Sequence, residues 1–185
     1  MALILAVDQC TKWLVRENLA LYEAWAPIPA LARVFTITHV QNTGVAFGQL
    51  AGVGWLFMAV NLAVLIGILV YYPRIPAGQW LPRLAAILIL AGDLGNVIDR
   101  VRTILIVARE TGSLWTALPF ASVTDFLDFQ IWPVFNVSDL SLVTGIVIVA
   151  FLMLQQERAR SREEAAAPTD ALPVSDDERG PQIGE

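Results

Sequence analysis

The stretch Val53–Tyr72 reads VGWLFMAVNLAVLIGILVYY and contains no charged side chain. A helix rises about 1.5 Å per residue, so about twenty such residues cross a hydrocarbon core roughly 30 Å thick. The whole chain of 185 residues is 56% hydrophobic and only 16% charged, which is more apolar than an ordinary soluble domain. The sequence therefore predicts an integral membrane protein, and this stretch is its clearest span.

Three other apolar runs predict three more spans. They cover Met1 to about Leu21, Leu84 to about Ile98, and Leu140 to Leu154, the last continuing a helix that begins near Asn136. The basic loop before Leu84 and the arginines after Leu154 both favour the cytoplasm. We therefore predict an all-α membrane protein with four transmembrane helices, with both termini in the cytoplasm and the remaining polar segments at the opposite membrane face.

The first run is the least regular, because it carries Asp8, Lys12 and Arg16. A cleavable signal peptide is the alternative interpretation of this run. In a signal peptide, however, the charges precede the apolar segment and a small-residue cleavage site follows it, and neither holds here. We therefore expect the first run to be a span.

The segments outside the spans have patterns of their own. Residues Val34–Gln41 alternate polar and apolar side chains with many β-branched residues, which predicts a strand, and NTGVAFG (42–48) then predicts a turn. Residues 101–134 predict a long external connection. Its aromatic side chains suit the membrane interface: Trp115, Phe120, Phe126, Phe129 and Trp132. Residues 1–155 are expected to form one membrane domain, and residues 156–185 a disordered, acidic cytoplasmic tail.

Composition excludes several classes of site. Cys10 is the only cysteine and His39 the only histidine, which rules out an intramolecular disulfide and a Cys-based metal cage. We expect Cys10 to be a small core residue and His39 to lie at the surface or in a hydrogen bond. No basic stripe interleaved with aromatic residues is present, so nucleic acid is not an expected partner. We predict no metal site and no cofactor.

Carboxylates within apolar sequence are the strongest functional signal. A charged side chain at the bilayer centre costs roughly 2.5–3.5 kcal/mol on insertion scales, so such residues usually serve a function. If Asp125 and Asp139 meet, their mutual repulsion would keep a proton on one of them near neutral pH, as in aspartic proteolysis. Asp128 lies close to Asp125 in the sequence, and the pattern alone does not choose between these two.

The other polar residues suggest a supporting network. Asp8 and Lys12 are spaced i, i+4 and predict an ion pair on one helix. Asn136 is a candidate N-cap for the last helix, which would place Asp139 one turn inside it. Three further residues share one helical face at i, i+3 and i+4, and either orient the aspartates or form a packing network: Asn96, Asp99 and Arg100. In the turn, Asn42 offers a side-chain amide to a peptide backbone, and Gly44 permits positive φ.

Taken together, these clusters resemble the signature of the lipoprotein signal peptidases, or signal peptidase II. The elements appear in order as DQCTK (8–12), NTGVAFG (42–48), GDLGNVIDR (92–100), VTDF (123–126) and FNVSD (135–139). The resemblance covers roughly residues 1–155. It implies a four-helix membrane aspartic peptidase with a small extracytoplasmic β-cradle and an extracytoplasmic connecting segment, working in the bacterial inner membrane.

The resemblance also implies a substrate and roles for residues. The enzyme would act as a monomer, with membrane lipids and diacylglyceryl-modified prolipoproteins as partners, and would cut just before the lipidated cysteine. By position in the motifs, the catalytic aspartates are Asp125 and Asp139 rather than Asp128. The remaining motif residues have supporting roles, and four of them match positions that hold the substrate or the antibiotic globomycin: Asn42, Asn96, Arg100 and Asn136.

Three features depart from the family pattern. The N-terminus is shorter than usual, the connection 101–124 is long, and Ser138 replaces the common alanine before Asp139. Ser138 could add a hydrogen bond near the two aspartates and shift their titration. From the residues alone, two other functions stay open. One is a proton-coupled carrier that uses the intramembrane Asp, Asn and Arg residues, and the other is a lipid-binding scaffold without catalysis.

Overall fold

A computed structural model describes residues 1–44 and 54–166. Residues 45–48 of the predicted turn and most of the predicted tail lie outside the described residues. The chain divides into two compact units, Met1–Leu152 and Met153–Glu185. The predicted domain boundary near residue 155 stays a prediction.

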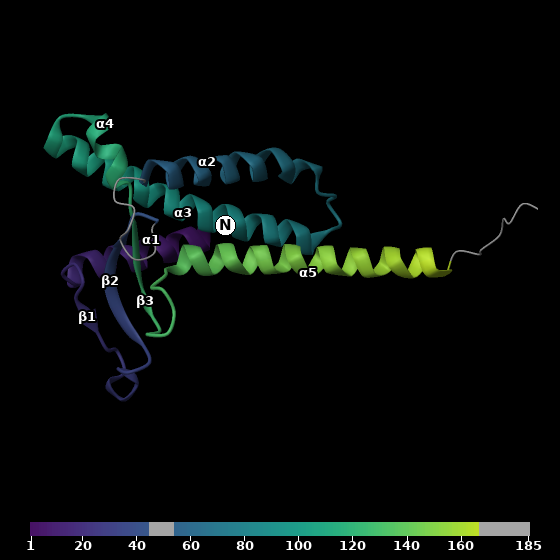
Figure 1. The fold of residues 1–185 in the computed structure, drawn as a ribbon, viewed down its shortest axis with the longest axis horizontal. Coiled ribbons are helices and arrows are strands. Elements are labelled where there is room, and N and C mark those ends of the chain that lie inside the picture. The colour runs from purple at the N-terminus through teal and green to yellow at the C-terminus, as the bar shows by residue number, and fades with distance from the viewer. Residues whose placement is uncertain (45–53, 167–185) are drawn as a thin grey trace, which may run out of the picture. The chain divides into compact units, whose positions relative to one another are not determined.

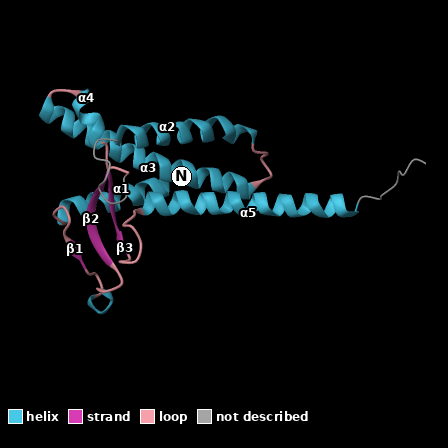
Figure 2. Cartoon of the chain, viewed as in Figure 1, coloured by secondary structure: helices cyan, strands magenta, loops and turns pink. Residues whose placement is uncertain are grey.

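The described chain is mostly helical, with a small sheet (Figures 1 and 2). Short 3₁₀ turns are η1 (Pro29–Leu31), η3 (Tyr72–Arg74) and η4 (Leu118–Phe120). The helices are α1 (Ala2–Asn18), α2 (Gly54–Tyr71), α3 (Trp80–Thr111), α4 (Leu114–Ala117) and α5 (Val137–Ala166).

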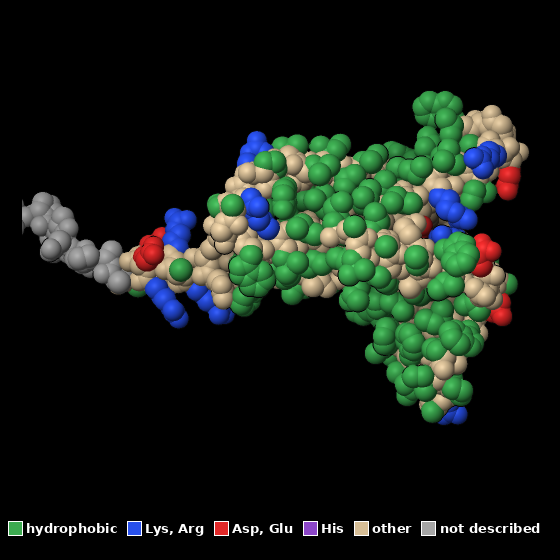
Figure 3. Space-filling view, turned by 180° about the vertical axis from the view of Figure 1, so that it is seen from behind, with side chains coloured by type: hydrophobic (Ala, Val, Ile, Leu, Met, Phe, Trp, Pro, Cys, Tyr) green, Lys and Arg blue, Asp and Glu red, His purple; other side chains and the backbone are tan. Residues whose placement is uncertain are grey.

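Three of the described helical segments are long and apolar enough to cross a membrane: Gly54–Arg74, Trp80–Thr111 and Val137–Ala165. Their outward side chains are apolar, and Leu69, Val147 and Phe151 are all more than half exposed. Figure 3 shows hydrophobic side chains over a broad area of the long helices. An exposed apolar surface of this kind fits a lipid environment. Three of the four predicted spans are therefore helices long and apolar enough to cross a membrane, and α1 does not meet these criteria.

Helix α3 is longer than the sequence pattern predicted. The apolar run was expected to end near Ile98, but α3 continues through Thr111 and ends at Gly112, whose φ of 72° is left-handed. In the part of α3 after Ile98, Ile104 packs with Ala117 and Ala121 in a small buried cluster. The predicted external connection is thus wrong in its first third, where the chain stays helical because these side chains bury one another.

The sheet has the order β1–β2–β3, with β1 (Ala24–Trp25) and β3 (Val123–Asp128) both antiparallel to β2 (Thr36–Asn42). Strand β2 confirms the predicted strand, although its buried residues, Thr36 and His39, do not alternate along it. Strand β3 packs against both α1 and α3, and its first four residues are buried. Phe126 is only 4% exposed, so its predicted place at a membrane interface is wrong. Strand β3 therefore places Asp125 in the interior, next to the helices.

Two smaller predictions also need correction. Helix α5 extends through Ala166, so residues 156–166 of the predicted tail are helical. Arg160 and Glu164 form an exposed ion pair on this part of the helix, with a distance of 2.9 Å between Nε and Oε1. Cys10 is exposed on α1 rather than packed in the core. His39 is buried, and its ring is hydrogen-bonded through Nδ1 to the Leu19 carbonyl oxygen, as one of the two predicted roles required.

Candidate active site

Strand β3 places Asp125 in the interior, opposite Val40 of β2. The side chain is only 2% exposed. Two amides donate hydrogen bonds to it: Asn42 Nδ2 to Asp125 Oδ2 at 2.8 Å, and Asn136 Nδ2 to Asp125 Oδ1 at 2.6 Å. Each carboxyl oxygen therefore accepts a hydrogen bond from a different amide, one 83 residues and the other 11 residues away in the sequence.

Asp139 is fixed by the first turn of α5. The backbone N–H of Asp139 donates to Asn136 Oδ1 at 3.0 Å, and the backbone N–H of Asn136 donates to Asp139 Oδ2 at 3.1 Å. This reciprocal pair is a capping box, which satisfies two helix donors at once. Asn136 is thus the predicted cap, and the same residue also binds Asp125. The capping role and the role in the site are both present.

Asn96 on α3 connects the two aspartates to the rest of the core. Its amide donates from Nδ2 to Asp139 Oδ1 at 2.8 Å. Its Oδ1 accepts from Asn136 Nδ2 at 3.3 Å and from Lys12 Nζ at 3.1 Å. Hydrogen bonds through Asn136 and Asn96 therefore connect Asp125 with Asp139.

The surroundings of the two aspartates differ. Asp125 is buried, whereas Asp139 is partly exposed. Burial raises the pKa of Asp125 to about 7, and the negative charge of Asp139 adds to the rise. The hydrogen bonds from Asn42 and Asn136 and the charge of Lys12 oppose this increase. Asp125 can therefore hold a proton near neutral pH, which is the condition for one carboxyl group of the pair to act as an acid.

A buried charge cluster lies next to this pair. Lys12 Nζ is 3.0 Å from Asp8 Oδ2 and 3.1 Å from Asp99 Oδ2, and it also donates to Asn96. A lysine ammonium has three N–H donors, and these three acceptors match them. Both Asp8 and Lys12 have fully buried side chains. The predicted i, i+4 ion pair is confirmed, and it is joined by a second carboxylate.

Asp99 is hydrogen-bonded to strand β3 and not to Asp125 or Asp139. Its Oδ2 accepts from the backbone N–H of Thr124 at 3.1 Å, next to Asp125 in the chain. Arg16 donates to Asp99 Oδ1 at 3.4 Å and to Thr124 Oγ1 at 3.1 Å. Sequence reasoning gave Arg16 no part in the site. The only signal was its charge within an apolar run, one helical turn after Lys12.

Arg100 contacts α2 and the segment before β3, and the charges of Asp125 and Asp139 also act on it. It donates from Nε to Asn61 Oδ1 at 3.2 Å and from Nη1 to the Ala121 carbonyl oxygen at 3.1 Å, and it lies 5.8 Å from the Phe57 ring centroid. Asn61 in turn donates to Asp93, which is only 1% exposed. The expectation that Arg100 shares the surroundings of Asn96 is therefore only partly correct.

Asn61 and Asp93 were missed at the level of sequence. Asn61 was the one strongly polar side chain in the span 53–72, and Asp93 was a carboxylate inside the GDLGNVIDR motif. Polar residues within spans usually face a protein interior and bind one another. That rule would have identified both.

Two glycines allow close approach around the site. Gly44 has φ of 95°, and its backbone N–H donates to Asn42 Oδ1 at 2.7 Å, which orients Asn42 toward Asp125. The predicted positive φ is confirmed. At Gly95, a Cβ atom would overlap the Ser138 hydroxyl and lie 2.6 Å from Asp8 Oδ2. This position must stay without a side chain for α5 to reach α3.

Ser138 does not make the predicted side-chain hydrogen bond within the described residues. Its hydroxyl is fully buried and has no hydrogen-bond partner among the described residues. Its backbone N–H donates to Asp8 Oδ1 at 2.9 Å, an interaction that any residue except proline can make. The side-chain hydrogen bond expected near the aspartates is therefore absent from the described part of the chain.

Asp128 lies on the outer part of the sheet. It accepts from Thr38 Oγ1 and from the backbone N–H of Gln130, each at 2.9 Å. Asp125 and Asp128 are three residues apart on one strand, so they point to opposite faces. Only Asp125 faces α3 and α5. Within residues 1–44 and 54–166, no group of three His, Cys, Asp or Glu residues is arranged to hold a metal ion.

The comparison with known proteins agrees with this geometry. A sequence model described as "Signal peptidase (SPase) II" matches residues 1–155. The chain belongs to this family. Signal peptidase II proteins are peptidases, so this membrane protein is a hydrolase of that class.

Relatives and solved structures support the same assignment. A lipoprotein signal peptidase of Moorella thermoacetica is 37% identical over 87% of this chain and 94% of its own length. One from Bacillus subtilis is 38% identical over 88% of this chain and 95% of its own. A solved bacterial membrane enzyme is 26% identical with a TM-score of 0.68, covering 84% of this chain and 85% of that one. A second has 27% identity and a TM-score of 0.66, with coverages of 83% and 88%.

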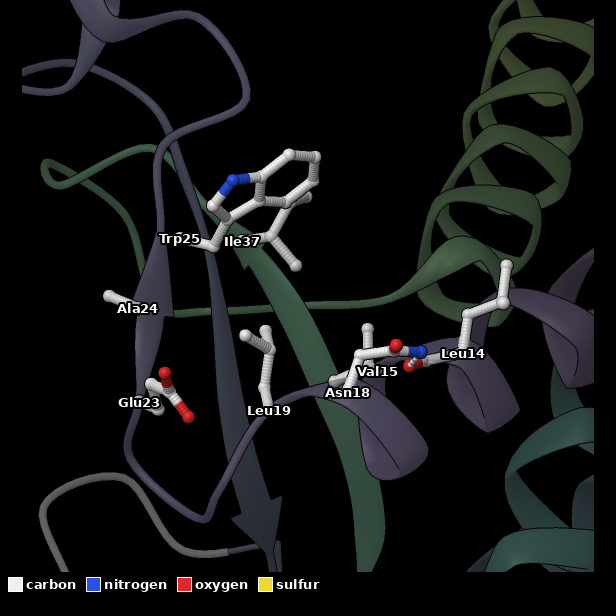
Figure 4. Close-up of a pocket in the computed structure, with 8 residues that line it drawn as sticks. All are labelled: Leu14, Val15, Asn18, Leu19, Glu23, Ala24, Trp25 and Ile37. Atoms are coloured by element: carbon white, nitrogen blue, oxygen red, sulfur yellow. Dashed lines mark hydrogen bonds between the residues drawn. The ribbon is translucent and has the colours of Figure 1, made fainter.

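This signal peptidase II chain also has an apolar groove between α1 and the sheet, shown in Figure 4. Its volume is about 590 Å³. None of the predicted site residues lines it. The lining residues are Leu14, Val15, Asn18, Leu19, Glu23, Ala24, Trp25 and Ile37.

Proposed function

We propose that this protein is an aspartic endopeptidase that removes the signal peptide from diacylglyceryl-modified prolipoproteins, cutting just before the lipidated cysteine. The relatives that it matches are named lipoprotein signal peptidases. The observation that carries the aspartic mechanism is the pair Asp125 and Asp139, both hydrogen-bonded to Asn136. The comparisons give no support to a proton-coupled carrier.

In the first step, the partly exposed Asp139 takes a proton from a water molecule. The water oxygen attacks the carbonyl carbon of the scissile peptide bond. Protonated Asp125 donates its proton to the carbonyl oxygen, which suits a group whose pKa burial raises to about 7. The product is a neutral tetrahedral intermediate, with Asp125 ionised and Asp139 protonated.

In the second step, the carbon–nitrogen bond breaks. Asp139 gives its proton to the departing nitrogen, and Asp125 takes a proton from one hydroxyl of the intermediate as the new carboxyl group forms. Both aspartates return to their starting states. Asn42, Asn96 and Asn136 keep the two carboxyl groups in register throughout, because their amides donate to these oxygens.

Asp8, Lys12, Asp99 and Arg100 have positioning roles in this proposal. Asp99 pins strand β3 through the Thr124 backbone, and Lys12 neutralises part of the buried negative charge. We further propose that α1 is the fourth membrane helix, because its polar residues Asp8 and Lys12 face the protein core and Trp13 and Leu14 are exposed.

The orientation follows from the basic segments. Arg74 and Arg83 flank the short α2–α3 loop, and Arg158, Arg160 and Arg162 follow the apolar part of α5, so both regions belong in the cytoplasm. The sheet and the aspartates then lie near the extracytoplasmic face of the bacterial inner membrane. A lipid-modified substrate can enter this site sideways with its acyl chains still in the hydrocarbon. We propose that the enzyme acts as a monomer.

Cleavage of a diacylglyceryl-modified prolipoprotein in detergent micelles tests the function. Wild-type protein should cut before the lipidated cysteine. Asp125→Asn and Asp139→Asn should each lower the rate by about 10²–10⁴-fold, the usual contribution of a general acid or base. Asp128→Asn is the matched control, because it removes a carboxylate from the same strand on the opposite face.

The outcomes separate the proposals. Loss of cleavage in the two variants, with activity retained in Asp128→Asn, supports the assigned pair. Equal rates in all four proteins would show that the pair is wrong. A wild-type protein that leaves a verified lipidated substrate uncut would instead point to a carrier or a lipid-binding scaffold.

A further inference from the structure

The outer face of α3 carries a groove that has no part in the site described above. Its volume is about 560 Å³, and it is shallow and open because all of its lining residues belong to α3. Seven residues line it: five are aliphatic, and the other two are Arg102 and Arg109. The aliphatic residues are Val97, Ile98, Val101, Leu105 and Ile106.

These residues form one stripe along the helix. Ile98, Arg102, Leu105 and Arg109 are spaced i, i+4, i+7 and i+11, which places them on the same helical face. Asn96 and Asp99, by contrast, are buried toward the aspartates. The groove and the candidate active site thus use different faces of one helix.

The length of α3 places the groove at a membrane boundary. The 32 residues of Trp80–Thr111 span about 48 Å, whereas the hydrocarbon core is roughly 30 Å thick. Arg83 and Arg102 are about 28 Å apart along the helix axis. Between them, the charged residues of α3 are all nearly buried: Asp93, Asp99 and Arg100. Arg102 therefore lies where hydrocarbon gives way to headgroups, and Arg109 lies about 10 Å farther out.

The charge of this region is positive and unpaired. Among the described residues, neither Arg102 nor Arg109 forms an ion pair, and the carboxylate of neighbouring Glu110 is not within ion-pair distance of either. Figure 3 shows basic side chains among hydrophobic ones at the end of α3 that leads to α4. Leu114 and Trp115, at the start of α4, are 59% and 83% exposed. Such a mixture of apolar, aromatic and basic side chains is typical of a membrane interface.

We propose that this groove binds an anionic glycerophospholipid. One acyl chain lies against the aliphatic wall, the phosphate accepts hydrogen bonds from Arg102, and the rest of the headgroup is within reach of Arg109. Guanidinium groups suit phosphate because their N–H donors match its oxygens. A zwitterionic lipid fills the aliphatic wall equally well, but its cationic headgroup is repelled by the second arginine. The groove is therefore selective for net negative charge.

The test uses the full-length protein in a mild detergent, titrated with phosphatidylglycerol or phosphatidylcholine and monitored by native mass spectrometry. Wild-type protein should bind phosphatidylglycerol in preference. Each basic residue at a membrane surface contributes roughly fivefold, so R102Q/R109Q should weaken phosphatidylglycerol binding by about 25-fold and leave phosphatidylcholine binding nearly unchanged. The matched control is R158Q/R160Q on the exposed end of α5, which removes the same charge.

A second variant tests the aliphatic wall. Leu105→Gln keeps both arginines but places a polar group in the groove, and it should weaken the binding of both lipids. Leu105 is 48% exposed, so this change should not disturb the core. The unfolding temperature of each variant without added lipid checks its fold.

Three results would overturn the proposal. The first is equal phosphatidylglycerol affinity in wild type and R102Q/R109Q. The second is an equal loss in R158Q/R160Q, which would indicate general charge attraction. The third is complete competition by inorganic phosphate, which would show a phosphate site that needs no lipid. The readout is lipid binding, so the proposal stands or fails independently of prolipoprotein cleavage.

Discussion

Replacement of Lys12 is the sharpest test of how this core is held together. Within residues 1–44 and 54–166, two acid–base pairs have the same i, i+4 spacing on helices. Asp8 and Lys12 are fully buried on α1, while Arg160 and Glu164 on α5 are 81% and 65% exposed. The two pairs differ most in burial, and they also differ in the order of acid and base along the helix.

The expected effects follow from that difference. Lys12→Met leaves Asp8 without a cation, while Asp99 keeps only the longer 3.4 Å contact to Arg16. Removing one partner of a buried pair costs about 3–5 kcal/mol, because the remaining charge stays desolvated. Arg160→Met should cost less than about 1 kcal/mol, since the exposed pair is solvated in either case.

The assay is thermal unfolding in detergent, followed by intrinsic tryptophan fluorescence. For a chain of this size, Lys12→Met should lower the unfolding temperature by roughly 6–20 °C. Arg160→Met should change it by only a few degrees. The double variant Asp8→Asn with Lys12→Met should recover part of the loss, because it removes the uncompensated carboxylate.

Either of two results would refute the reasoning. If Lys12→Met and Arg160→Met lower stability equally, burial does not control the strength of these pairs. If the double variant is as unstable as Lys12→Met alone, the loss comes from packing of the lysine stem rather than from the unpaired charge of Asp8.

Four other predictions follow from the site. The cleavage rate should fall as pH rises through about 7, because Asp125 then loses the proton that it donates, and a pH–rate profile measures this. Gly95→Ala should lower the free energy of unfolding by roughly 1–3 kcal/mol, because the added methyl group overlaps Ser138 and Asp8. Gly67→Ala, with open space around it, should be neutral, and thermal unfolding of the two variants measures the difference. Ser138→Ala should leave the pH–rate profile unchanged, because the hydroxyl has no described partner, and a shifted profile would show that it does act on the aspartates. Asn61→Leu should leave Arg100 and Asp93 without their shared amide and lower the free energy of unfolding by about 1–3 kcal/mol. Denaturation in detergent measures this loss, and Asn18→Leu, at an exposed position, should not cause it.

Much of the site was identified by residue type and order. The motifs contained the two aspartates, the three amides and the Asp8–Lys12 pair, and the structure brings them together. The pattern alone left Asp125 and Asp128 equivalent. The resemblance to a family chose Asp125, and the sheet gives the physical reason, because only that carboxylate faces α3 and α5.

Other residues became visible only through contacts between distant segments. Arg16 reaches Asp99 and Thr124 across 83 and 108 residues of sequence, and Asn61 lies 39 residues before Arg100. The periodicity of side chains along a single helix or strand does not reveal contacts between such distant residues. The extension of α3 beyond Ile98 has the same origin, since Ile104 is buried only because Ala117 and Ala121 return to cover it.

The sequence by itself determined that this protein spans a membrane and which polar groups it keeps there. Both properties follow from hydropathy and from the free-energy cost of a charge in hydrocarbon, which act on each segment separately. Only the tertiary structure decided which carboxyl group is buried, which amides bind it and which face of α3 meets lipid. Those outcomes depend on how helices and strands pack across the whole chain, and an aspartate acquires its pKa from that packing and not from its neighbours in sequence.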